Sequence, residues 1–283
     1  NPQYGPAPAP AQPAGGQPQY QPQGGQPVYV QAGANPQQPA AAPRQGVPAP
    51  PQARSPFELT QEQFEQLWSV LRAWHAESSK VETLRCQLDL WEYDQVFNKD
   101  KPVHRQGELH YAKPDRGIYR MKDAEGKNLR EHWLCDGKSV YEYKYDEQVL
   151  VEHQLPPELQ GQGIANGPMP FLFGSTPEQL VSRYYLRLNT PPNVEGSQIW
   201  LEAVPRYQQD AANFKLATII LIRETMQLDA IQLISPNGKD RTVHRLREPV
   251  VNDRFNFIRG SDFSADLPRG WTKKVNPGGN PPG

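Results

Sequence analysis

Cysteine is scarce in this sequence: its 283 residues include only Cys86 and Cys135. Two cysteines are too few for a disulfide scaffold, and their wide separation makes no zinc-ligand pair. Each lies in a strand-like run, so we favour two small buried residues, and an oxidising compartment leaves a disulfide between them open. The chain also has no apolar run long enough to cross a membrane.

A strong excess of charge is absent as well. The formal net charge is −1, and the first 55 residues contribute two arginines, Arg44 and Arg54, and no acidic residue. No basic stripe or Arg-Gly tract is present, which argues against a nucleic-acid partner. The sequence shows no signal peptide, but it begins with Asn1 rather than Met, which indicates a mature or trimmed product.

The motifs of common catalytic sites are missing too. Six histidines occur, but none has the spacing of a metal-binding motif, and there is no G-x-S-x-G, P-loop or dinucleotide-binding fingerprint. The acidic residues alternate mostly onto the polar faces of strands, where a solvated surface role is expected. We therefore expect no catalytic residues, no metal and no cofactor, and the protein is not predicted to be an enzyme.

Composition divides the chain into three parts. Residues 1–55 are almost entirely Pro, Gln, Ala and Gly, and are predicted to be a disordered tail because they have too little apolar surface to offset the entropy of ordering. Residues 56–268 are predicted to form one domain, and residues 269–283, which end in NPGGNPPG, a flexible C-terminal tail.

The domain is predicted to begin with a long helix. Thr60 and Gln63 have the spacing of a capping box, and apolar side chains then recur at helical intervals. This apolar stripe is expected to cover a large surface, and its leading members are Phe64, Leu67, Trp68 and Leu71.

After this helix the apolar period changes to two, which is typical of half-buried strands. Asp136-Gly137 and the segment SPNGKD at 235–240 predict hairpins, and Thr176 with Pro177 predicts the start of a short helix. We count roughly ten strands with short connections. The predicted fold class is mainly β (α+β): a single antiparallel incomplete β-barrel, covered by the long N-terminal helix and a short lid helix.

One apolar triplet falls in a loop-like segment. Phe171, Leu172 and Phe173 lie between Pro170 and Gly174. Apolar side chains of this size need a buried surface, so we predict that the segment from Pro170 to Phe173 is a lid over the concavity that a curled sheet leaves unfilled.

The segments GELHYAKPDRGIYRM (107–121) and CDGKSVYEY (135–143) resemble the LolA family of periplasmic carriers of outer-membrane lipoproteins. MPFLFG (169–174), LEAVPR (201–206) and DAIQLISPNGKDRTVHRL (229–246) are similar to the lid region, a strand end and the late hairpin of that family. The resemblance covers about residues 57–268. It implies an incomplete barrel whose cavity holds the acyl chains of a lipoprotein.

The resemblance and the strand alternation together indicate the residues that line such a cavity. These are Leu88, Leu90, Leu109, Tyr111, Tyr119, Met121, Trp133, Leu186, Ile219, Leu221, Ile231 and Leu233. The family arginine that bonds the closed lid falls at Lys113, which lacks the planar fork of donors of arginine. Lys113 is therefore a candidate for lid control, with a lysine at a strand end that keeps its charge in water as the alternative.

The resemblance implies a periplasmic, exported protein that binds acyl chains of lipoproteins or other lipids. Membrane-bound donor and acceptor proteins are its implied partners, and a monomer is expected. One alternative is a periplasmic sensor or interaction module, in which the same fold detects lipid and signals to a partner. Another is a scaffold whose own side chains fill the cavity.

Overall fold

The computed structural model describes residues 55–96, 101–157, 160, 175–253 and 263–277. The predicted lid, Pro170 to Phe173, and the predicted tail before residue 55 lie outside these residues. The described part is mainly β, with one large open sheet and few helices, which confirms the predicted fold class.

The helices are α1 (Gln61–Ser78), α2 (Pro177–Arg183) and α3 (Gln208–Ala211). The first strands along the chain are β1 (Thr83–Tyr93), β2 (Val103–Ala112), β3 (Arg116–Lys122), β4 (Leu129–Asp136), β5 (Ser139–Lys144) and β6 (Val149–Gln154). The later strands are β7 (Tyr184–Leu188), β8 (Gln198–Pro205), β9 (Leu216–Ile222), β10 (Leu228–Ile234), β11 (Arg241–Val251) and β12 (Thr272–Asn276).

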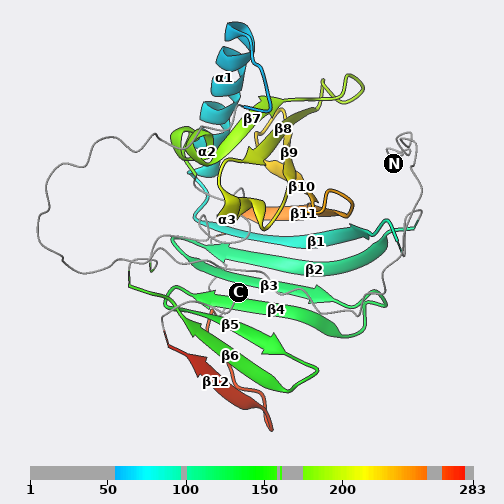
Figure 1. Cartoon of the computed structure of the whole chain (residues 1–283). Coiled ribbons are helices and arrows are strands. Elements are labelled where there is room, and N and C mark those ends of the chain that lie inside the picture. The colour runs from blue at the N-terminus through cyan, green and yellow to red at the C-terminus, as the bar shows by residue number, and fades with distance from the viewer. Residues whose placement is uncertain (1–54, 97–100, 158–159, 161–174, 254–262, 278–283) are drawn as a thin grey trace, which may run out of the picture.

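All twelve strands form one sheet in the order β12-β6-β5-β4-β3-β2-β1-β11-β10-β9-β8-β7. Strand β1 lies near the centre, because β2 to β6 extend the sheet in one direction and β11 to β7 extend it in the other (Figure 1). The two edge strands, β12 and β7, do not pair with each other, so the sheet is open. Neighbouring strands are antiparallel except for the parallel pair β12 and β6.

Both predicted helix starts are confirmed. The Thr60 hydroxyl accepts a hydrogen bond from the Gln63 backbone N–H, and the Gln63 side chain accepts one from the Thr60 N–H. Thr176 and Gln179 form the same reciprocal pair at the start of α2, with Pro177 in the first turn. Such caps satisfy backbone donors that a helix leaves unpaired. The two helices pack on each other and on β7, at one end of the sheet (Figure 1).

The sheet has two chemically different faces. We call the face that carries Leu88, Leu109 and Ile219 the inner face, and the face that carries Asp89, Glu108 and Ile118 the outer face. The main core lies on the inner face, where side chains of α1 and α2 join those of β1 to β3 and β7 to β11. Strand alternation thus gives one continuous apolar face, with polar residues behind it.

A smaller core lies on the outer face of β3 to β6. Ile118, Leu134, Tyr143 and Leu150 form it, and the segment from Phe263 to Trp271 packs against it. The Tyr143 hydroxyl donates to the Asp266 carbonyl oxygen at 3.1 Å, which ties that segment to the sheet.

The C-terminal end corrects one prediction. Residues 269–283 were expected to be a flexible tail, but Thr272–Asn276 form β12 beside β6. Lys273 binds Glu152 of β6 at 2.6 Å, which helps hold this strand at the edge. The sequence shows no apolar alternation here because four of the five side chains are exposed.

Candidate functional site

The predicted cavity residues share the inner face. The strand register places Leu109 opposite Tyr119, and Tyr119 opposite Trp133. On the other side of β1, it places Leu201 opposite Ile219 and Ile219 opposite Ile231. Whether these side chains contact a ligand remains a prediction.

Burial separates the twelve residues into two groups. Nine are packed into the main core, each at most 5% exposed: Leu88, Leu90, Leu109, Tyr111, Met121, Leu186, Ile219, Leu221 and Ile231. The remaining three, Tyr119, Trp133 and Leu233, keep part of their surface accessible. A ligand on this face would therefore reach the second group first.

The helix residues divide in a similar way. Leu67 and Leu71 are buried in the main core, and Trp68 is partly exposed. Phe64 is 42% exposed and packs edge-on against the Trp68 ring. Because α1 contacts β7 and α2 at one end of the sheet, the apolar stripe that it buries is narrower than the sequence predicts.

Lys113 contacts the C-terminal end of helix α1. Its Nζ donates to the carbonyl oxygen of Ser79 at 2.8 Å, and it binds Glu82 at 3.0 Å. Ser79 is the C-cap of α1, where a cation is favourable for the helix dipole. Within the described residues, Lys113 therefore fastens the end of α1 to the sheet, and its predicted role in lid control remains a prediction.

Two inner-face rings have an unusual environment. Tyr119 and His244 are enclosed by protein atoms on most sides, yet both keep accessible surface. Burial raises the pKa of the Tyr119 hydroxyl, and burial lowers the pKa of His244 to about 4. Both side chains are therefore neutral near pH 7.

A charged cluster adjoins these rings on the inner face. Arg105 lies between Glu92 and Glu131, with nitrogen–oxygen distances of 2.9 Å and 3.2 Å. Burial raises the pKa of Glu131, although Arg105 opposes this effect. Arg105 is opposite Leu90 in the register, and Leu90 is opposite His244. The apolar inner face therefore has a polar rim at this end of the strands.

The sequence did not single out His244, Arg105 or Glu131 as site residues. A signal for His244 was available in the alternation of Thr242, His244 and Leu246, which all point to the inner face. The ion pair of Arg105 with Glu131 could not be found that way, because it joins β2 to β4.

The cysteines do not act as a reactive pair. Both are free thiols, and burial raises the pKa of Cys86 to about 12 and that of Cys135 to about 11. Thiols that stay protonated are poor nucleophiles and poor metal ligands. The described residues contain no cluster of three or more His, Cys, Asp or Glu that could hold a metal ion. No described helix is long and apolar enough to span a membrane.

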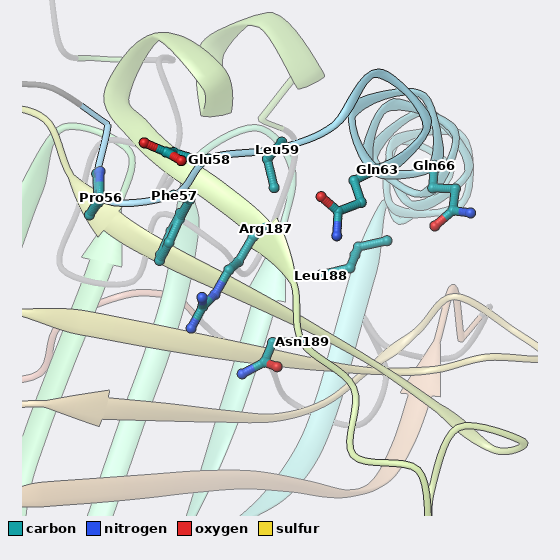
Figure 2. Close-up of a pocket in the computed structure, with 9 residues that line it drawn as sticks. All are labelled: Pro56, Phe57, Glu58, Leu59, Gln63, Gln66, Arg187, Leu188 and Asn189. Carbon is teal, nitrogen blue, oxygen red and sulfur yellow. The ribbon is translucent and has the colours of Figure 1, made fainter.

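A polar pocket of about 340 Å³ lies elsewhere, between the segment before α1 and the end of β7 (Figure 2). Its lining residues are Pro56, Phe57, Glu58, Leu59, Gln63, Gln66, Arg187, Leu188 and Asn189. The Arg187 guanidinium lies 4.4 Å from the centre of the Phe57 ring, and its Nε donates to Glu202 at 2.6 Å. The amides and charges of this pocket do not suit an acyl chain.

No protein-family model matches the chain, and no curated protein matches it. Among solved structures, it is similar to an uncharacterized conserved protein from Thermus thermophilus, with 12% identity, a TM-score of 0.42, and coverage of 76% of this chain and 100% of the other. The lipoprotein LppX of Mycobacterium tuberculosis is 11% identical, with a TM-score of 0.38 and coverage of 66% and 97%. A LolA superfamily protein from Nitrosomonas europaea is 10% identical, with a TM-score of 0.35 and coverage of 69% and 98%. Because these identities are low, the likenesses concern the fold alone.

Proposed function

We propose that this protein binds acyl chains of lipids or lipoproteins on the inner face of its open sheet, and that it carries them through the periplasm. The observation that supports the proposal most is the pair of enclosed but accessible rings, Tyr119 and His244, beside an apolar face. Leu233 and Trp133 share that face and that partial exposure. Ligand sites for apolar molecules have this character: mostly apolar walls with a few polar groups.

The energetics allow binding that is strong but reversible. Each buried methylene contributes roughly 0.8 kcal/mol, so a 16-carbon chain represents about 12 kcal/mol before the costs of association. The polar rim of Arg105, Glu92 and Glu131 gives the polar end of such a ligand a place near water. The tightly packed part of the inner face is already occupied by side chains of α1 and α2, which limits how much of a chain can be buried.

The proposal is tested by titrating the full chain with a fluorescent fatty-acyl probe and by native mass spectrometry of detergent-free protein. A charge placed on the inner face is the sharpest perturbation. We expect Leu233→Asp to weaken probe binding at least tenfold, because a carboxylate in an apolar site is costly.

Alternation supplies a matched control for this variant. Gln232 is the preceding residue of β10 and is also partly exposed, but its side chain lies on the outer face. Gln232→Asp should leave probe affinity within about twofold of the wild type. Absence of any bound lipid or probe in the wild-type protein would refute acyl binding.

A second candidate function is a periplasmic sensor or interaction module. The polar pocket beside β7 favours it, because a site lined by amides and Arg187 is suited to a polar partner (Figure 2). A pull-down from envelope extract separates the two functions. Recovery of diverse lipoproteins supports the carrier, whereas one stoichiometric regulatory protein, lost in Arg187→Glu, supports the sensor.

A further inference from the structure

His244 on the inner face has a ring nitrogen without a hydrogen-bond partner among the described residues. The Nδ1 atom of His244 is buried, and no hydrogen bond to it is found in the described part of the chain. A buried polar atom without a partner is destabilising, and such atoms are uncommon in folded proteins. The neighbours of the ring explain the lack of a partner: Leu90 faces it from β1 and Ile231 from β10.

The ring also lies at a boundary within the face. Leu246, two residues further along β11, belongs to the main core, whereas Arg105 and its two carboxylates lie one strand beyond Leu90. The residue keeps part of its surface accessible although its Nδ1 atom is buried, so a ligand reaches this nitrogen only when the ring or a neighbouring side chain moves. His244 is therefore placed where the apolar part of an acyl ligand would meet its polar end.

We propose that His244 is a specificity-determining residue, and that its Nδ1–H donates a hydrogen bond to the ester or amide carbonyl at which an acyl chain is attached. This inference rests on the proposed function, since it assigns a polar contact within the same site. A neutral imidazole can carry its single proton on either ring nitrogen, so Nδ1 is free to act as the donor. The contact gives the buried nitrogen the partner that it lacks in the protein alone.

The ligand class follows from this chemistry. A carbonyl-linked acyl chain satisfies His244, whereas an alkyl chain attached through an ether leaves the nitrogen unpaired. Sites built around a hydrogen bond reject analogues that lack the bonding group more strongly than apolar sites reject small changes in length. The protein should therefore distinguish acyl lipids from alkyl lipids of equal length.

A matched pair of probes tests this directly: 1-hexadecanoyl and 1-hexadecyl lysophosphatidylcholine, below their critical micelle concentrations. They share the head group and the 16-carbon chain and differ at the linkage, which is an ester in one and an ether in the other. We expect the wild-type full chain to bind the ester about tenfold more tightly, and His244→Phe to bind both probes with the affinity of the wild type for the ether. His244→Gln, which keeps a neutral donor, should recover part of the preference.

The outcomes of this experiment distinguish a failure of the role of His244 from a failure of the proposed acyl binding. Equal wild-type affinity for the two probes overturns the role of His244 and leaves acyl binding intact. Loss of both probes in a folded His244→Phe also overturns it, since the ring would then only shape the site. Binding of neither probe by the wild type overturns acyl binding as well. The wild-type comparison decides the question even if a variant does not fold.

Discussion

The inner face has two parts, one around β8 and β9 and one around β10 and β11, which are both apolar but differ in how tightly their side chains are packed. Around β8 and β9, Leu201, Ala203 and Ile219 have no exposed surface. Around β10 and β11, Leu233 and His244 keep accessible surface although they alternate in the same way. The difference lies in what covers the strands, because α1 and α2 insert their apolar side chains at the β7 end.

This contrast indicates which residues of the inner face would contact a ligand under the proposed function. The filled end behaves as an ordinary core, which stabilises the fold and has no room for a ligand. The partly exposed side chains Leu233, His244, Tyr119 and Trp133 contribute less to stability, and under the proposed function they are the ones that contact a ligand. Stability and ligand affinity should therefore respond to substitutions at different positions.

The largest effect on the free energy of unfolding is expected when a leucine is replaced by alanine in each of the two parts of the inner face. Leu201→Ala removes a fully buried side chain and should lower the free energy of unfolding by about 3 kcal/mol, whereas Leu233→Ala should cost about 1 kcal/mol. Acyl-probe affinity should follow the opposite order, with a clear loss only for Leu233→Ala. Urea unfolding and probe titration measure the two quantities. Equal destabilisation by both variants would mean that the site near Leu233 is as tightly filled as the core.

The sequence predicts the faces of the sheet better than their packing. The strand register places all twelve candidate residues, which alternation and the family resemblance predicted together, on one face. Capping patterns located both helix starts, because these signals are local. The position of α1 over β7 depends on contacts between distant segments, so the exposure of Phe64 and the accessible surface of His244 could not be predicted. Strand β12 escaped detection since its pairing with β6 leaves most of its side chains in solvent.

A substitution on the outer face should lower the free energy of unfolding without changing acyl-probe affinity. Trp271 packs 5.2 Å from the Tyr145 ring and 6.2 Å from the Tyr143 ring, measured between centroids. Trp271→Ala should lower the free energy of unfolding by about 1–2 kcal/mol, less than for a fully buried aromatic residue, because Trp271 is partly exposed. Probe affinity should be unchanged, since the contacts lie on the other face. A large loss of affinity in this variant would show that the two faces are coupled.

The smallest effect concerns pH and involves two histidines whose pKa is lowered by burial. Burial lowers the pKa of His244 on the inner face and of His132 on the outer face to about 4 each. His132 is also held neutral by its contacts, because its Nε2 accepts from Arg120 and its Nδ1 donates to the Tyr145 hydroxyl.

The unfolded chain binds protons at these histidines near pH 6.5, whereas the folded chain does so only near pH 4, so stability falls as the pH drops from 6.5 towards 4. Each histidine should contribute on the order of 1 kcal/mol to the loss between pH 7 and pH 5, a window above the range in which carboxylates such as Glu108, with a pKa of about 2, begin to matter. Urea unfolding at the two pH values should therefore show a smaller loss in His244→Phe than in the wild type, and an unchanged loss would contradict the enclosure of this ring.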